Sequence, residues 1–507
     1  MKDVVTLELL PLGERVQLPR GAALQDALFA HGVEFPCGGR GRCKGCRVRV
    51  ISGDLPITAE DRQKLSGDDL AAGWRLSCRA RAEGDLRIEI AQWETAILSD
   101  ESVFSFTPRP GAGIAIDIGT TTLVGQLIDL QSARVLAVRT GLNAQARHGA
   151  DIMSRIEFAM AGEGQRVLEE LIRRQVGRMC EELLAAAPGA SALRRVILVG
   201  NTVMHHLFGG ISVEPLSHVP FEPRHAGLLR FRTRDLGWDL PDDPEIRFLP
   251  CLGGFVGSDI LAGVAATRLP EREALTVLLD LGTNGEIVVG NRKRLLCAST
   301  AAGPAFEGAR ISMGMRAATG AVSEVRLEEG RLRCHVLGGG PPRGLCGSGL
   351  VDAVAVGLDL DLIRPNGRLA NGDAWVLTEP VSLSQWDIRE LQLAKGAIAA
   401  GLDLLLREWG AAPDDVDQVL LAGAFGNYIH RASARRIGLL NFPAEKIKPV
   451  GNTALLGAKL ALFDDRLAAD GEGGIAAKIE HVSLHENPRF QETYVEHMVF
   501  PSATDSP

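Results

Sequence analysis

A short turn motif occurs twice in this chain, and the repeat constrains the fold more than any other feature of the sequence. The first copy lies in residues 114–125, where an apolar stretch ends at Asp117 and leads through Gly119 into three threonines. The second copy lies in residues 277–290, about 160 residues later, with apolar segments on both sides of Asp-x-Gly-Thr. A single Asp-x-Gly turn ends many hairpins, but two copies in register predict two similar halves that face one ligand.

The residues of the first turn suit a phosphate group. Asp117 stands at the end of a predicted strand, where its carboxylate would orient Mg2+ and the water around the ion. Gly119 and the hydroxyl residues after it offer backbone N–H and side-chain O–H groups to phosphate oxygens. The sequence therefore predicts phosphate contacts from Gly119, Thr120, Thr121 and Thr122.

A third glycine-rich segment follows a buried-type apolar strand in residues 419–427, and its turn offers a place for a flat base. In this order the three motifs resemble the actin, sugar-kinase and heat-shock-protein-70 ATPase superfamily. The resemblance implies two ribonuclease-H-like halves with ATP and Mg2+ in the cleft. It assigns the second phosphate motif to Asp280, Gly282, Thr283, Asn284 and Gly285, and the adenosine motif to residues 421–426, including Gly423, Ala424, Phe425 and Gly426.

Four carboxylates are candidates for the chemistry of ATP hydrolysis. Asp117 and Asp280 would hold Mg2+, and either Glu286, directly after the second motif, or Glu307 would polarise the attacking water. A structural hydrogen bond is an equally good interpretation of either glutamate.

The first ninety residues contain a separate motif made of cysteines. Cys37, Cys43, Cys46 and Cys78 have the spacing C-x5-C-x2-C followed by 31 residues and a fourth cysteine. Sulfurs from one glycine-rich loop and one distant strand end can converge on two irons, which favours a 2Fe-2S cluster. Structural zinc is the alternative, although zinc sites usually pair two CxxC-like knuckles.

Local patterns around these cysteines predict a small mixed α/β unit. Alternation predicts strands at residues 4–10, 14–18, 47–51 and 86–90, and helices are expected at 22–31 and after Thr58, which has an acid three positions later. The segment resembles the 2Fe-2S ferredoxin family with its β-grasp fold. Basic side chains crowd the cluster loop, and they form either a docking patch for an acidic partner or an ordinary solvated face: Arg40, Arg42, Lys44, Arg47 and Arg49.

The length of 507 residues favours about three structural units. We expect an α/β multidomain chain: a ferredoxin domain at 1–92, a linker at 93–112, the two halves of an actin-like ATPase at 113–270 and 271–465, and a C-terminal segment at 466–507 that packs back on the ATPase. A net charge of -8 argues against nucleic acid and anionic membranes as partners. No signal-type or membrane-spanning run occurs, and five further cysteines fit buried thiols, so we expect a cytoplasmic protein.

Finer strings in residues 143–156, 200–207, 302–308, 314–317 and 392–398 resemble the reductive activators of corrinoid-dependent methyltransferases. The resemblance implies an ATP-dependent transfer of one electron from the 2Fe-2S cluster to Co(II) of a partner corrinoid protein, which restores Co(I). It also implies an external low-potential electron donor and adds Lys395 to the nucleotide-binding residues. Better-known members carry a small extra domain between ferredoxin and ATPase, where this chain has only about twenty residues, so dimerisation through that domain does not carry over.

Two other functions remain open at this point. One is a small-molecule kinase or ATP-dependent hydrolase with a regulatory cluster, and the other is a non-enzymatic redox-responsive binding protein. The segments 299–308 and 312–316 are candidates for gripping a partner. His205 and His206 follow a buried strand, where core or capping histidines are more common than metal ligands or proton carriers.

Overall fold

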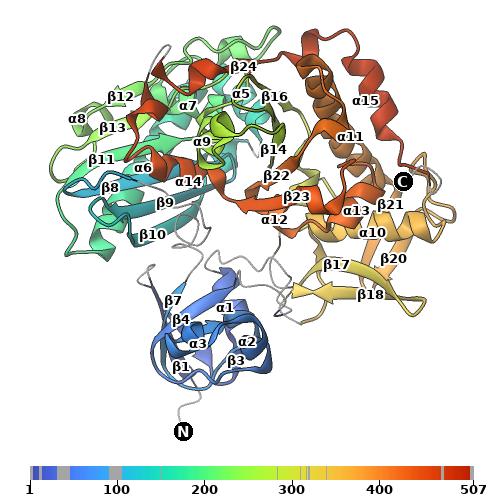
Figure 1. Ribbon diagram of the computed structural model, residues 1–507, viewed down its shortest axis with the longest axis horizontal. Coiled ribbons are helices and arrows are strands. Elements are labelled where there is room, and N and C mark those ends of the chain that lie inside the picture. The colour runs from blue at the N-terminus through green and yellow to red at the C-terminus, as the bar shows by residue number, and fades with distance from the viewer. Residues whose placement is uncertain are drawn as a thin grey trace.

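The computed structural model describes residues 4–10, 14–30, 41, 46–90, 106–149, 151–282, 284–308, 310–315, 317, 320–337, 340–469 and 473–502. Figure 1 shows a small N-terminal unit below a larger two-lobed body.

The N-terminal unit is built on a five-stranded mixed sheet in the order β2-β1-β7-β4-β5. The central pair β1 and β7 is parallel, and the other neighbours are antiparallel. The elements of this unit are β1 (Val4–Leu10), β2 (Glu14–Pro19), β3 (Ala22–Ala23), α1 (Leu24–Ala30), β4 (Arg47–Ser52), α2 (Ala59–Lys64), α3 (Gly67–Ala71), β5 (Trp74–Leu76), β6 (Arg81–Ala82) and β7 (Leu86–Ile90).

The local patterns located most of these elements. The predicted strands are all present, and Thr58 caps α2 in a reciprocal capping box with Asp61. The predicted helix at 22–31 is wrong at its start, because Ala22 and Ala23 pair with the short strand β6. That pairing is formed with residues about sixty positions away, which a local pattern cannot reveal.

The first lobe contains a six-stranded sheet in the order β10-β9-β8-β11-β13-β12. The first three strands form an antiparallel meander, whereas β11 lies parallel to β8 and β13 parallel to β11. Its elements are β8 (Ala112–Ile118), β9 (Thr122–Asp129), β10 (Val135–Leu142), α5 (Ile152–Met160), α6 (Gly164–Ala186), β11 (Leu193–Val199), α7 (Thr202–Gly209), β12 (Leu229–Phe231), α8 (Thr233–Leu236), β13 (Glu245–Phe248) and α9 (Ser258–Ala266).

The second lobe repeats the topology of the first five strands of that sheet order, whereas its sixth strand, β24, joins the opposite edge, beside β16. Its main sheet has the order β23-β22-β14-β15-β16-β24, with the meander β14, β15, β16 antiparallel and β22 and β23 added in parallel. The strands are β14 (Thr276–Leu281), β15 (Gly285–Gly290), β16 (Leu295–Thr300), β22 (Gln418–Ala422), β23 (Ile447–Gly451) and β24 (Ile479–His481). The prediction of two similar halves from the repeated turn is therefore confirmed.

The second lobe also carries elements outside its main sheet. The strands β17, β18 and β19 form a small sheet, β20 and β21 form a hairpin, and α15 lies along α11 (Figure 1). These elements are β17 (Ala321–Glu328), β18 (Arg331–Val336), β19 (Gly344–Leu345), α10 (Gly347–Asp359), β20 (Ala374–Thr378), β21 (Val381–Ser384), α11 (Gln385–Trp409), α12 (Gly423–Tyr428), α13 (Arg431–Arg436), α14 (Thr453–Leu460) and α15 (Phe490–Met498).

Helices α9 and α14 join the two lobes. They pack so closely that a Cβ atom added at Gly457 of α14 would lie 2.1 Å from the carbonyl oxygen of Ala262 on α9. Apolar side chains of both sheets meet around this helix pair in one buried cluster, which includes Ala115 of β8 and Leu278 of β14. The two lobes therefore share one buried core around α9 and α14.

The chain enters the first lobe next to α14. Arg109, in the segment before β8, donates hydrogen bonds to the carbonyl oxygens of Leu462 and Phe463 and pairs with Asp465. Asp465 also pairs with two arginines of the first-lobe sheet, Arg195 and Arg247. These contacts fix the last residues of the predicted linker to the ATPase. Within the described residues, no helix is both long enough and apolar enough to cross a membrane.

Candidate functional site

Four carboxylates, one buried and three half-buried, meet where the two lobes face each other. Asp117 lies near the end of β8, and Asp280 occupies the corresponding place on β14. Glu286 is the cross-strand partner of Asp280 on β15, and Asp259 lies in the first turn of α9. We refer to these four residues as the cleft carboxylates.

Burial and mutual repulsion raise the pKa values of the cleft carboxylates. Burial followed by the charge of Asp280 raises the pKa of Asp117 to about 7, although the Asn452 hydrogen bond opposes the shift. Burial raises the pKa of Asp280 to about 6. Burial and the charges of Asp117 and Asp280 raise the pKa of Asp259 to about 8. The pKa of Glu286 is raised well above its usual value by burial and by Asp259 and Asp280.

In the part of the chain that the structure describes, no three acidic, cysteine or histidine side chains are placed to hold a metal ion by themselves. A Mg2+ ion at the cleft carboxylates would therefore need water and phosphate oxygens as further ligands. Among the described residues, none of the four carboxylates forms an ion pair with a lysine, arginine or histidine, so their charges are not compensated within the protein. Hard cations such as Mg2+ prefer carboxylate oxygens and retained waters as ligands. A Mg2+ ion brought in with a nucleotide would relieve the repulsion that raises these pKa values.

Sequence reasoning missed Asp259. The residue lies about 140 positions after Asp117, and only the packing of α9 between the two sheets brings it to the other carboxylates. The local signal that could have identified it is Gly-Ser-Asp at the start of an apolar helix.

The first phosphate loop has its carbonyl groups turned into the protein. The side-chain amide of Asn143 donates to the carbonyl oxygen of Gly119 at 2.9 Å, and Arg155 donates to that of Thr120. The backbone N–H of Asn143 donates to the carbonyl oxygen of Thr121 at 2.9 Å. Among the described residues, the N–H groups of Thr120 and Thr121 have no acceptor, so they are available to an anion.

Gly119 and Thr122 close this loop. The N–H of Gly119 donates to the carbonyl oxygen of Thr122 at 3.1 Å, and a Cβ atom at position 119 would lie 2.6 Å from that oxygen. Only glycine fits here, as the turn motif implied.

The second phosphate loop is placed at the end of β14, opposite the first. The N–H of Gly282 donates to the carbonyl oxygen of Asn284 at 3.1 Å, which makes the turn tight. The side chain of Thr300 donates to the carbonyl oxygen of Gly285 and anchors the start of β15. Thr283 lies outside the described residues.

The adenosine motif begins with a glycine that touches the second phosphate strand. Gly423 has a φ of +79°, and a Cβ atom there would lie 2.6 Å from Oδ1 of Asp280. Residues 423–428 form the short helix α12 rather than an open glycine turn. The ring of Phe425 is buried and stacks on Phe306 at 4.5 Å, so it packs in the core of the second lobe. Gly426 packs against Leu421, and the side chain of Ala424 lies outside the described part of the chain.

Lys395 lies in a different environment from the residues above. Its side chain is 1% exposed, and Nζ donates to the carbonyl oxygen of Val499 at 2.7 Å above the ring of Phe500. None of its contacts with described residues involves a phosphate loop. Lys395 anchors the C-terminal segment to α11, and these contacts lend no support to the expected role in nucleotide binding.

The described half of the cysteine motif lies together in the N-terminal unit. Cys46 and Cys78 are both buried thiols, and Ser77 donates two hydrogen bonds to the carbonyl oxygen of Cys46, from its N–H at 3.1 Å and its hydroxyl at 2.7 Å. The two cysteine-bearing segments are thus held side by side, as the ligands of one cluster must be. Cys37 and Cys43 lie outside the described residues.

The remaining candidates have structural surroundings. His205 and His206 are fully buried, and each ring donates a hydrogen bond to a nearby backbone carbonyl oxygen, that of Gly227 and Thr202 respectively. In the segment 312–316, the N–H of Ser312 donates to the carboxylate of Asp387 at 2.6 Å, which fixes it to the start of α11.

Family models match nearly the whole chain. Residues 8–83 match the 2Fe-2S iron-sulfur cluster binding domain, residues 112–272 match the RACo middle region, and residues 274–507 match the C-terminal domain of RACo, described as an ASKHA domain.

Two relatives align with most of the chain. The chain is 34% identical to the corrinoid activation enzyme RamQ of Eubacterium limosum, over 96% of this chain and 98% of the relative, in an alignment of 599 positions. It is 29% identical to a [Co(II) methylated amine-specific corrinoid protein] reductase of Methanosarcina barkeri, over 76% of each chain. The solved structure of a reductive activator for a corrinoid, iron-sulfur protein aligns with a TM-score of 0.69 and 26% identity, over 98% of both chains.

Proposed function

The chain belongs to the family of corrinoid activation enzymes, and we propose on this basis that it passes one electron from a 2Fe-2S cluster to Co(II) of a partner corrinoid protein in an ATP-dependent step. The product is the Co(I) state that accepts a methyl group. One observation carries this function: a single chain combines two kinds of site. The ferredoxin unit holds two free thiols in neighbouring segments, and the two lobes bring together four carboxylates that form no ion pair with a basic side chain among the described residues.

Four cysteines would hold the cluster, which supplies one-electron chemistry at low potential when bound. We assign Cys37, Cys43, Cys46 and Cys78 to this role. The contact between Ser77 and Cys46 supports the assignment for the last two, because it keeps their segments together without any metal.

The nucleotide would bind between the lobes with Mg2+ at the cleft carboxylates. Asp117 and Asp280 would orient the ion, which would supply positive charge to the phosphates and to the attacking water, and Glu286 would accept a proton from that water. The N–H groups of Thr120 and Thr121 contact phosphate, and Gly423 gives the nucleotide access beside Asp280.

ATP acts on the position of the lobes rather than on the electron. A one-electron transfer uphill by 59 mV costs about 1.4 kcal/mol, so a gap of about 120 mV lies within the range of a population shift driven by binding. The α9–α14 pair is the element that such a shift would move, because it joins the two sheets.

An external low-potential donor must reload the cluster, and we place the reaction in the cytoplasm. The thiols of Cys180, Cys251 and Cys297 support a reducing compartment, because they are buried, unpaired and have raised pKa values through burial.

The test is anaerobic reduction of a Co(II) corrinoid protein that co-purifies with this chain. Cobalt absorbance should report Co(I) only when the reduced chain and Mg2+-ATP are both present. Hydrolysis of ATP that requires a small molecule and no corrinoid protein would instead identify a kinase or hydrolase. If Co(II) is reduced at the same rate without ATP, the proposal that nucleotide binding in the cleft drives the electron transfer is wrong.

A further inference from the structure

Arg155 is a fully buried arginine directly behind the first phosphate loop. It lies on α5 and is 0% exposed. Its Nε donates to the carbonyl oxygen of Gly149 at 2.9 Å, and its Nη1 donates to Oε1 of Gln145 at 3.1 Å and contacts Sδ of Met204 at 3.4 Å. Its Nη2 donates to the carbonyl oxygen of Thr120.

None of these acceptors carries a charge. Buried charges in proteins are ordinarily paired with an opposite charge, because isolation from water is costly. Among the described residues, no carboxylate forms an ion pair with Arg155, and the acid that acts on it, Asp151, uses its carboxylate to cap α5 through the N–H of Ser154. Burial lowers the pKa of Arg155 to about 10, which leaves it cationic at neutral pH.

The bond to Thr120 sets the direction of the next N–H group. A trans peptide is planar, and its C=O and N–H point in opposite directions. Since Arg155 holds the carbonyl of Thr120 inside the protein, the N–H of Thr121 must point the opposite way, out of the loop. Asn143 does the same for the preceding peptide, because it holds the carbonyl of Gly119 and so directs the N–H of Thr120.

Asn143 and Arg155 orient neighbouring peptide groups of the same loop, but only Arg155 carries a charge. Asn143 shows that a neutral amide is enough to orient a peptide of this loop. Arg155 performs the same orientation and adds a positive charge that no ion pair of the described residues balances, since Asp151 acts on it only at a distance. A buried positive charge destabilises the folded protein, and a neutral side chain would orient the peptide equally well. The charge of Arg155 therefore points to an anionic ligand that balances it.

We propose that Arg155 is a positioning residue for the phosphate groups of the nucleotide. It directs the N–H of Thr121 toward the phosphates. Its positive charge is balanced when the anionic phosphates bind at residues 119–122. The inference rests on the proposed function in that the cleft must bind a nucleotide.

The test compares ligands that share the base but differ in phosphate. The dissociation constants of Mg2+-ATP, ADP and adenosine are measured by titration calorimetry on the full chain. In Arg155→Gln we expect ATP to bind about tenfold more weakly, as one charge interaction at low effective dielectric implies, while adenosine changes less than twofold. Arg155→Lys keeps the charge and should recover part of the ATP affinity.

A second variant keeps Arg155 in place. In Gln145→Glu a carboxylate would stand beside Nη1 of Arg155 and balance its charge, so ATP affinity should again fall about tenfold with adenosine unchanged. This variant answers the question even if Arg155→Gln does not fold.

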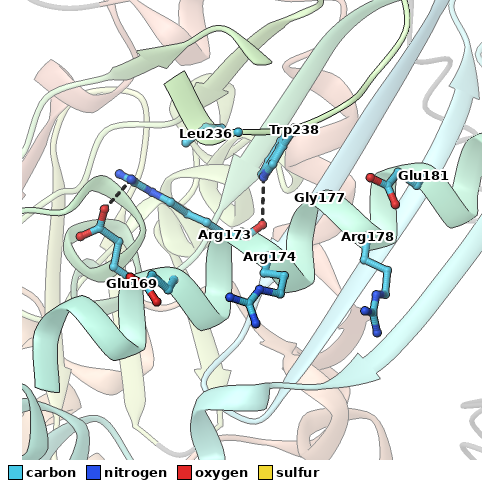
Figure 2. A pocket seen from close by; sticks show the side chains of 10 residues that line it. Glu169, Arg173, Arg174, Gly177, Arg178, Glu181, Leu236 and Trp238 are labelled. Carbon is cyan, nitrogen blue, oxygen red and sulfur yellow. Dashed lines mark hydrogen bonds and ion pairs between the residues drawn. The ribbon is translucent and has the colours of Figure 1, made fainter. Parts of the chain in front are cut away.

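Arg173 provides the matched control in the same lobe. Figure 2 shows Arg173 of α6 paired with Glu169, and its carbonyl oxygen accepts a bond from the indole of Trp238. These residues line a surface groove on α6. Arg173→Gln should leave the ratio of ATP to adenosine affinity unchanged.

The outcomes distinguish this inference from the function on which it rests. Equal losses of ATP and adenosine affinity in the Arg155 and Gln145 variants, or no loss, would show that Arg155 has only a structural role. A wild-type chain that binds no adenine nucleotide would overturn the proposed function and this inference together.

Discussion

The side-chain amide of Asn452 donates a hydrogen bond to the carboxylate of Asp117 over 3.2 Å, and the two residues come from different lobes. Asn452 follows β23 of the second lobe and caps α14, since its Oδ1 accepts the N–H of Leu455 at 2.8 Å. One side chain thus connects a cleft carboxylate to the start of the helix that joins the lobes. A change at Asp117 therefore acts directly on the lobe-connecting pair α9 and α14.

Asn452→Asp should weaken Mg2+-ATP binding about tenfold, because it places a second carboxylate against Asp117 while keeping the oxygen that caps α14. Calorimetry measures the affinity, and small-angle X-ray scattering should show a larger radius of gyration than in the wild type. Asn487→Asp is the control, since Asn487 also caps a backbone N–H, that of Arg489, without a carboxylate partner. Unchanged ATP affinity in Asn452→Asp would show that the hydrogen bond between Asn452 and Asp117 does not contribute to nucleotide-driven closure of the lobes.

Cys46→Ser and Cys78→Ser should each remove the brown colour of anaerobically purified protein, which we expect to bind about two irons per chain. Iron analysis and visible absorbance measure the loss. Cys334→Ser is the control, because Cys334 is half-buried beside the carbonyl of Leu377 in the second lobe. Stoichiometric zinc without iron would contradict the cluster assignment.

Asp259→Asn should stabilise the nucleotide-free protein at pH 8 and reduce the stabilisation by Mg2+-ATP. The pKa of Asp259 is raised to about 8 in the folded state, so between its usual value of 3.8 and 8 the folded chain holds a proton that the unfolded chain has released. Wild-type stability therefore falls as the pH rises through this window, by up to about 1.4 kcal/mol per pH unit. The variant lacks this loss, and melting temperatures between pH 5 and 8 measure the difference.

Asp243 provides a control of opposite sign for that experiment. Its pKa is lowered, first by the hydroxyl of Thr233, so its contribution to stability is present above its usual pKa and is lost on acidification. Asp243→Asn should lower the melting temperature at neutral pH and leave Mg2+-ATP stabilisation unchanged. A destabilised Asp259→Asn would show that Asp259 has a structural role.

Lys395→Met should flatten the dependence of stability on pH above neutrality. Burial lowers the pKa of Lys395 to about 7 from its usual 10.5, so in this window the unfolded chain binds a proton that the folded chain has released. Wild-type stability therefore rises with pH between 7 and 10.5, by up to about 1.4 kcal/mol per unit. Melting temperatures at pH 7, 8 and 9 measure the slope, and nucleotide affinity should not change. A large loss of ATP affinity would restore the nucleotide-binding role.

Deletion of eight residues within the segment 93–105 should slow electron delivery to the corrinoid protein and leave ATP binding intact. The reason is that Arg109 fixes the chain to the ATPase, so the deletion shortens only the part before this anchor. Stopped-flow absorbance measures the electron transfer, and a separately supplied ferredoxin segment should restore part of the rate at high concentration. A full rate in the shortened chain would indicate a ferredoxin that works from a fixed position.

The features predictable from the sequence are those encoded over a few residues. The repeated Asp-x-Gly-Thr motif located the equivalent tight turns after β8 and β14, and Thr58 with Asp61 located a helix start, because turns and caps are local chemistry. Asp259 was missed because its role comes from packing between two sheets. Lys395 was assigned from a sequence string alone, and only the contact with Val499 reveals its surroundings.

The contact between Gly423 and Asp280 could not be predicted from the sequence either. The glycine-rich string predicted a turn, but the reason for a glycine is the carboxylate that lies where its Cβ would be. Two residues separated by more than one hundred positions are coupled here by sheet pairing, since β22 runs parallel to β14.

The three arginines that pair with Asp465 join the start of the ATPase to the end of its helix α14. Arg109 lies just before the first strand of the ATPase and Asp465 just after its last lobe-crossing helix, so the chain enters the ATPase at the place where that helix ends. Phe106, just before Arg109, also packs its ring on Phe463 at 4.9 Å. A carrier of any length attached ahead of this corner would therefore deliver its chain to the same fixed point beside the end of α14.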